Sequence, residues 1–187
     1  MAVLFISENK LKKSTTINGN VDVELLRPYM KVAQDIHIHP KLGTDLYEKL
    51  QTDITGSSLS GNYEKLVESY IQDALVHWTL YECIPFLGYK IMNKNIVRKT
   101  SETSENAGLD ELNYLREVVR NTAEWYTERM IDYIRHNTSL FPEYSSNTNE
   151  DLTPTTQNYY SGMNLDPVAP DYKITLNDFL TPDLRMY

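Results

Sequence analysis

The sequence predicts a mainly α-helical fold: a small helical bundle with a short β-hairpin or long loop and with extended arms at both termini. Two observations lead to this prediction. Between residues 22 and 142 most apolar residues recur at spacings of three and four, the pattern of amphipathic helices. Both ends of the chain lack that pattern. We therefore divide the 187 residues into an extended N-terminal arm (1–21), a helical domain (22–142) and an extended C-terminal tail (143–187).

Composition narrows the function classes. A formal net charge of −8 argues against a tight grip on nucleic acid, which needs clustered Lys and Arg. No apolar run approaches the roughly 20 residues of a membrane span, so we expect no membrane partner. The single cysteine, Cys83, allows no internal disulfide and fits a reducing compartment. Fourteen tyrosines against four phenylalanines favour half-buried positions and protein interfaces, because Tyr joins an apolar ring to a polar tip.

The first elements are read as an arm followed by two helices. Residues 1–21 combine a short β-capable run with a turn-like Asn-Gly-Asn and are read as extended. A helix then runs to Ile36; Pro28 either lies in the first turn of a helix that starts near Leu26 or kinks a longer helix that starts at Asp22. Residues 37–40 are expected to leave the helix, because the residue before Pro40 is pushed to extended geometry.

The next elements follow from the turn after Pro40. Residues 42–44 supply a turn at Gly43 and an N-cap at Thr44, which begins a short helix to about Thr52. A core helix is predicted over 63–84, with an apolar surface wide enough to be covered on more than one side. Pro85 and Gly88 are expected to end it.

The second half of the helical domain holds the hairpin and the longest helix. Residues 89–100 alternate about an asparagine-bearing turn, which predicts a β-hairpin or a long loop. A long helix over about 109–137 is expected to pack lengthwise on another helix, through apolar residues near a seven-residue repeat. The members of that repeat are Leu112, Leu115, Val119, Thr122, Tyr126, Met130 and Tyr133.

The C-terminal tail combines a polar segment with apolar residues near its end. Residues 145–162 are dominated by Ser, Thr, Asn, Pro and Gln and cannot bury enough apolar surface to order themselves. Apolar side chains of the kind that free tails usually lack then follow at Tyr172, Ile174, Leu176, Phe179 and Leu180. We expect these residues to dock on a partner and to order on docking.

Few residues are candidates for chemistry. His37 and His39 form an H-x-H pair that in an extended segment would present both imidazoles to one side, as two metal ligands, but no other cluster completes a site. No glycine-rich phosphate loop, nucleophile elbow, paired cysteines or zinc-protease helix is present. We therefore expect no catalytic residue, no metal and no cofactor, and a protein that is not an enzyme.

Two stretches resemble the opening helices of head-to-tail connector (adaptor) proteins in the neck of tailed bacteriophages, most closely those of crAss-like phages. In these proteins a helix carrying Ala-Gln precedes an Ile-x-Pro-x-Leu-Gly turn and a helix carrying Leu-Tyr. The same pattern stands here at residues 26–35 and 38–47. Residues 78–87 and 90–101 extend the similarity, in which a long helix runs into a proline-bearing turn and an Asn-rich strand or loop. The resemblance covers about the first two thirds of the chain.

The resemblance implies a structural virion protein, assembled in the cytoplasm of a bacterial host. Its copies would form a ring, usually twelve-fold, that joins the portal protein to the tail and passes DNA through its lumen without specific binding. A second neck or tail component, such as a tail terminator or stopper, is the alternative, and a small helical enzyme or regulator is a further one. The residues expected at subunit or partner interfaces are Phe5, Pro28, Tyr29, Ile38, Pro40, Leu42, Gly43, Tyr47, Tyr172, Ile174, Leu176, Phe179 and Leu180.

Overall fold

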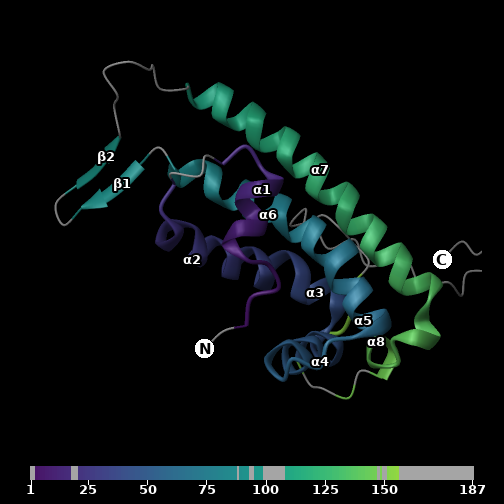
Figure 1. Ribbon diagram of the computed structural model, residues 1–187. Coiled ribbons are helices and arrows are strands. Elements are labelled where there is room, and N and C mark those ends of the chain that lie inside the picture. The colour runs from purple at the N-terminus through teal and green to yellow at the C-terminus, as the bar shows by residue number, and fades with distance from the viewer. Residues whose placement is uncertain are drawn as a thin grey trace, which may run out of the picture.

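The computed structural model describes residues 3–17, 21–87, 89–92, 95–98, 108–146, 148 and 151–155. It confirms a mainly helical bundle with a short β-hairpin. Three long helical segments form its body: α2 lies on one side of α6, and α7 runs along α6 as the longest helix (Figure 1). The tail residues that were predicted to dock on a partner, within 172–180, lie outside the described part of the chain.

The N-terminal segment is not an extended arm, in contrast to the prediction for residues 1–21. Helix α1 (Glu8–Ser14) begins after Ser7, whose side-chain oxygen accepts a hydrogen bond from the backbone N–H of Lys10. Leu11 of α1 is fully buried, and apolar residues on both sides of α1 are buried with it. The helix is only seven residues long, too short to give a clear periodicity in the sequence.

Helix α2 (Val23–Ala33) continues without a break through a π-helical turn, η1 (Gln34–Ile38), into α3 (His39–Leu42). Asp22 caps α2, so Pro28 lies inside the longer of the two helices considered. The expected exit from the helix at residues 37–40 is wrong. The N–H of His39 bonds the carbonyl of Gln34, five residues back, and this wider turn gives the ring of Pro40 room beside the preceding turn.

The chain reverses at Gly43 and enters α4 (Thr44–Thr55). Gly43, not Thr44, is the residue that precedes the helix as its cap. The predicted core helix is longer than expected: α5 (Gly61–Leu66), a second π-helical turn, η2 (Val67–Ile71), and α6 (Gln72–Leu87) form one rod that passes through Pro85. Pro85 lies two residues before the end of the rod, so the helical hydrogen bond that it removes is one of the last.

The hairpin pairs β1 (Tyr89–Met92) with β2 (Asn95–Arg98) in antiparallel register, with Tyr89 opposite Arg98. Helix α7 (Leu109–His136) returns along α6, as predicted. A 3-10 turn, η3 (Thr138–Leu140), and α8 (Glu143–Ser146) then bring the chain back to α4.

The core lies where α6 meets its neighbours. Helix α6 is apolar nearly all round and is covered by α2 on one side and α7 on the other, as its wide apolar surface predicted. The face that α7 buries carries Ala123, Thr127, Met130, Ile131 and Ile134. Of the predicted seven-residue repeat, Met130 is buried and Tyr126 and Tyr133 are partly buried against the core, so the buried face is rotated about the helix axis relative to that repeat. None of the described helices is both long and apolar enough to cross a membrane.

Candidate functional site

The turn between α3 and α4 has a backbone conformation that favours glycine. Gly43 has φ 75° and ψ 158°, in a region of backbone space that is essentially restricted to glycine. A Cβ atom at this position would lie 2.6 Å from the Cγ atom of Pro154. The backbone at Gly43 and the ring of Pro154 therefore meet at a point where no side chain fits at residue 43.

Residues 151–155, here named the strap, lie across this turn. The N–H of Thr44 donates to the carbonyl of Leu152 at 2.9 Å, and the N–H of Leu152 donates back to the Thr44 hydroxyl at 3.0 Å. Three residues later the N–H of Thr155 donates to the carbonyl of Pro40 at 2.8 Å. The strap thus runs from Thr44 back towards Pro40, opposite to the chain direction of the turn that it covers.

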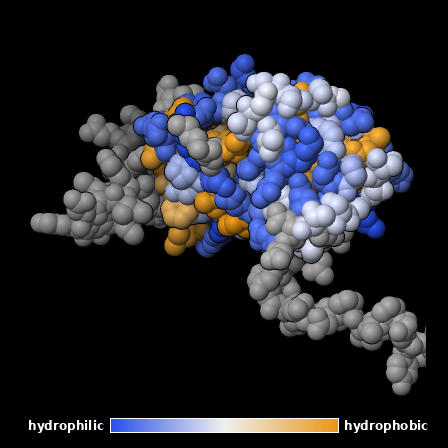
Figure 2. All heavy atoms as spheres, turned by 90° about the horizontal axis from the view of Figure 1, so that it is seen from below, coloured by the Kyte–Doolittle hydropathy of each residue, from blue (hydrophilic) through white to orange (hydrophobic). Residues whose placement is uncertain are grey.

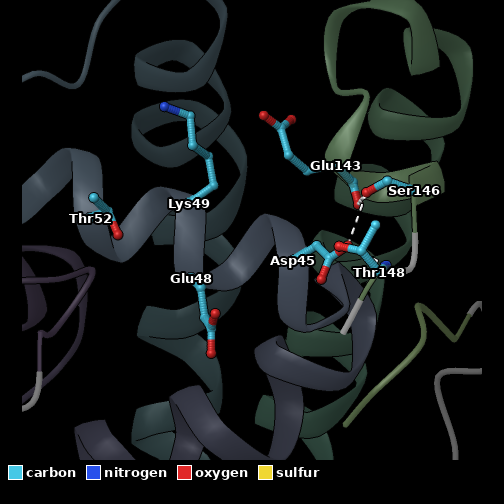
Figure 3. A pocket seen from close by; sticks show the side chains of 7 residues that line it. All are labelled: Asp45, Glu48, Lys49, Thr52, Glu143, Ser146 and Thr148. Atoms are coloured by element: carbon cyan, nitrogen blue, oxygen red, sulfur yellow. Dashed lines mark hydrogen bonds between the residues drawn. The ribbon is translucent and has the colours of Figure 1, made fainter. Parts of the chain in front are cut away.

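The segment before the strap is held by one carboxylate at the start of α4. Asp45 accepts hydrogen bonds from the Ser146 hydroxyl at 2.9 Å and from both the N–H and the hydroxyl of Thr148 at 2.7 Å (Figure 3). These groups line an open hollow of about 580 Å³ that Glu48, Lys49, Thr52 and Glu143 also line. Lys49 carries the hollow's positive charge but pairs with Asp53 at 2.8 Å. The hollow is polar and open, and its hydrogen bonds to Asp45 hold Ser146 and Thr148, the residues that lead into the strap.

Gln34 ties the N-terminal segment to the same region. Its side-chain oxygen accepts from the N–H of Phe5 at 2.8 Å, and its amide donates to the carbonyl of Val3 and to the hydroxyl of Tyr47. The Tyr47 hydroxyl donates in turn to Asp35 at 3.2 Å. Burial raises the pKa of Tyr47 to about 12, so this phenol stays protonated at neutral pH. The network is a structural joint between the N-terminal segment, the π turn and α4.

The two histidines of the H-x-H pair have separate partners. The ring of His37 stacks on that of Trp78 with centroids 3.7 Å apart, and its Nε2 lies 2.9 Å from Glu82. His39 stacks on Tyr47, and its Nε2 lies 3.0 Å from the Thr44 hydroxyl. Burial lowers the pKa of His39. Because the pair stands on a helical turn and not on an extended segment, the expected convergence of the two rings does not occur. Among the residues that the structure describes, no three His, Cys, Asp or Glu side chains are grouped to hold a metal ion.

Most of the predicted interface residues that the structure describes are interior residues of the subunit. Phe5, Ile38, Leu42 and Tyr47 are buried. Phe5 and Tyr47 contact each other, with ring centroids 5.2 Å apart. Gly43 is buried under the strap, and Pro40 is partly covered by it. Apolar periodicity identifies residues that become buried, but it does not show whether they are buried in the core of the subunit or at an interface with a partner.

Pro28 and Tyr29 belong instead to an exposed apolar face. Helix α2 turns Leu25 and Val32 to the solvent, and the adjoining turn η1 exposes 58% of the surface of Ile36. Pro28 is exposed on the same helix, and Tyr29 stacks on Phe86 with ring centroids 5.2 Å apart. We name Leu25, Pro28, Tyr29, Val32 and Ile36 the α2 stripe. Their spacings of three and four place them on one side of α2, away from its buried residues.

A second apolar face lies on α7. Leu115, Val118 and Trp125 are 50%, 45% and 57% exposed, and Tyr114 is 67% exposed. We name these four residues the α7 stripe. The sequence analysis assigned Leu115 to the packing repeat and did not name Trp125. The signal for Trp125 was a large aromatic residue on α7 that lies outside that repeat. In the view of Figure 2, apolar residues break a largely polar surface in separate patches.

The two stripes face away from each other. Helices α2 and α7 pack on opposite sides of α6, as Figure 1 shows. In the α2 stripe Leu25, Val32 and Ile36 are exposed while Tyr29 contacts Phe86 of α6, and the four residues of the α7 stripe are all exposed. Exposed apolar surface of this kind marks interaction sites in soluble proteins. This pair of surfaces is therefore the candidate functional site of the described chain.

The family model of DUF6712, a family of unknown function, matches residues 38–153. The matched range begins at Ile38 in the π turn and ends inside the strap, so it contains both partners of the hydrogen bond between Thr44 and Leu152 and stops one residue before Pro154. No curated protein and no solved structure matches the chain.

Proposed function

This chain belongs to DUF6712, a family of unknown function, and we propose that it is a structural subunit of the neck of a tailed bacteriophage. Copies of it would form a ring that joins the portal to the tail and passes DNA through the lumen. In this proposal the protein is not an enzyme, and its interfaces are its function.

The observation that carries the proposal is the pair of apolar stripes on opposite sides of the bundle. A ring of identical subunits needs two different surfaces on each copy, because each copy contacts one neighbour with its front and the other with its back. Surfaces that face in opposite directions can meet this requirement, whereas a single apolar patch would favour a closed two-fold dimer. The resemblance of residues 26–47 to connector proteins supports the same reading from an independent source.

The surrounding chemistry fits a subunit that passes DNA without holding it. The formal charge of −8 gives a surface that repels phosphate, so a lumen lined by such subunits would not retain the duplex. The histidine, tyrosine and carboxylate contacts described above join elements of the subunit to one another, which is a structural use of these groups.

Native mass spectrometry tests the proposal. The purified chain should be measured alone and after mixing with the portal protein of the phage that encodes it. We expect a closed oligomer, twelve-fold by the resemblance, at least in the presence of portal, and electron microscopy should show it as a ring with an open centre. A chain that stays monomeric with portal, and that virion images place away from the channel, would contradict the proposal.

A further inference from the structure

We infer that residues 172–180 of the C-terminal tail dock on the α2 stripe of the same chain in the free subunit. The inference goes beyond the ring proposed above, because it concerns the isolated chain and assigns an occupant to one of the two apolar surfaces.

The strap sets the direction in which the tail leaves the bundle. Leu152 pairs with Thr44, and Thr155 pairs with Pro40. A chain that continues on this course passes from Pro40 towards Ile36, one helical turn earlier, and then along α2 towards Leu25. The strap therefore delivers the tail to the end of the α2 stripe.

The length of the intervening chain matches the distance to be covered. Residues 156–171 separate the strap from Tyr172 and include Gly162, Pro167 and Pro170. A flexible linker of that length has a root-mean-square span of about 20–24 Å. Along the helix axis, Val32 lies roughly 12 Å and Leu25 roughly 22 Å from Pro40. Tethered docking is most favourable when the span of the linker matches the separation of its two ends.

The side chains of the tail segment suit an apolar helix face. Tyr172, Ile174 and Leu176 alternate with polar residues, so an extended backbone places all three on one side. Alternate residues of an extended chain lie about 6.8 Å apart, and one turn of helix rises about 5.4 Å. Three such side chains therefore span about 14 Å, most of the roughly 16 Å, or three turns, of the α2 stripe from Leu25 to Ile36. Because the span of the linker matches the distance from Pro40 to Leu25, Tyr172 docks near Leu25, and the segment runs back along the stripe so that Phe179 and Leu180 lie at the Ile36 end.

Docking would hide one of the two surfaces that the proposed ring needs. This consequence, unlike the inference itself, rests on the proposed function. A subunit whose α2 stripe is covered by its own tail has one free apolar face, so it would remain unassembled until a partner displaced the tail. The portal or an already placed neighbour would supply that competing contact.

Thiol labelling measures the coverage in the intact chain. The only native cysteine, Cys83, is buried, and burial raises its pKa to about 12, so it reacts slowly and gives a low background. A Val32→Cys variant with the native tail should be labelled about tenfold more slowly than one that also carries Ile174→Asp, Leu176→Asp and Phe179→Asp. The reason is that a docked tail leaves the stripe open only about a tenth of the time. A Leu115→Cys variant on the α7 stripe is the matched control, and its labelling rate should not change. Equal rates for Val32→Cys with and without the tail substitutions would overturn the inference.

Disulfide trapping separates docking within one chain from docking between chains. A Val32→Cys, Leu176→Cys double variant should form an intramolecular bond on mild oxidation, at a rate independent of protein concentration. A Leu115→Cys, Leu176→Cys variant should not form one. Crosslinked dimers that increase with concentration would show that the segment belongs to a neighbouring copy, which contradicts the inference but not the ring. Trapping within one chain in a protein that never forms rings with portal would leave the inference standing and reject the proposed function.

Discussion

Gly43 is constrained by its backbone and by its neighbour. Its φ of 75° and ψ of 158° cost a residue with a Cβ atom about 1–3 kcal/mol, and that atom would also meet the ring of Pro154. We expect Gly43→Ala to lower the free energy of unfolding by at least that amount, as measured by chemical denaturation.

Substitution of Pro154 separates the cost of the backbone conformation at Gly43 from the cost of the contact with the ring. In a Pro154→Ala background the ring is gone, so Gly43→Ala should cost less than in the native background, while the backbone cost remains. The two single variants and the double variant give the coupling directly. If the costs simply add, the contact with the strap does not constrain Gly43, and only its backbone conformation does.

His39 and His77 make stability depend on pH. Burial lowers the pKa of both side chains in the folded protein. The unfolded chain therefore takes up protons first as the pH falls through about 6.5, and stability is lost from there down to the folded pKa values. We expect the free energy of unfolding to fall between about pH 7 and pH 5, and the slope to be smaller in a His39→Gln, His77→Gln variant. A slope in the variant equal to that of the native protein would assign the dependence to other groups.

At the scale of the elements, α6 and α7 are joined by one buried polar contact. The indole N–H of Trp78 donates to the hydroxyl of Thr127 at 2.8 Å, and that hydroxyl donates to the carbonyl of Ala123. Thr127→Val would leave the indole N–H buried without an acceptor, and we expect a loss of about 1–3 kcal/mol in unfolding free energy.

Two further variants test this assignment. Thr122→Val is the control, because that hydroxyl bonds only its own helix, at the carbonyl of Val118, near the surface. It should cost much less than Thr127→Val. Trp78→Phe combined with Thr127→Val removes both polar partners and should recover part of the loss. Equal costs for the two threonine variants would show that the contact between the helices contributes nothing.

The sequence predicted some helices and strands well and others not at all. Periodicity predicted α4, α7 and the rod that contains α6, and alternation about an asparagine turn predicted the hairpin. The sequence analysis predicted a break in the helix at Pro40, because the rule for the residue before proline applies to an ordinary α-helical turn. The structure has a π turn there, to which the rule does not apply. Periodicity missed α1, which shows one buried residue in seven. The strap could not be predicted at all, because its contacts join residues about a hundred positions apart.

The candidate site was predicted only in part. Pro28 is exposed and Tyr29 half-buried, so their predicted role at an interface stays a prediction, whereas Phe5, Ile38, Leu42 and Tyr47 are interior residues. A sequence gives the apolar side of each helix but not the neighbour that covers it. The α7 stripe shows the same limit: Leu115 has the spacing of a packing residue, yet half of its surface is exposed.

At the scale of the whole molecule, the α7 stripe is the surface left for assembly. We expect Trp125→Glu to leave the thermal unfolding midpoint almost unchanged, because the side chain is already 57% exposed, and to reduce oligomer formation with portal at least about tenfold. Native mass spectrometry gives the second quantity. Asn121→Glu adds the same charge to an exposed position on α7 and should assemble normally. If both variants assemble as the native chain does, the α7 stripe is not an interface.

The π turn that follows α2 also has a consequence for which changes in chain length the subunit tolerates. A π turn holds one residue more than the α turn that it replaces, while the helices on either side keep their faces. Loss of Ile36, which is exposed, would convert η1 into ordinary α-helix without rotating Gln34 or Ile38 out of the core. A gain or loss of one residue anywhere else in α2 would rotate everything beyond it by about 100° and misplace the Gly43 turn. We therefore expect deletion of Ile36 to leave the chain folded, and deletion of one residue within Val23–Ala33 to destabilise it strongly, as measured by chemical denaturation.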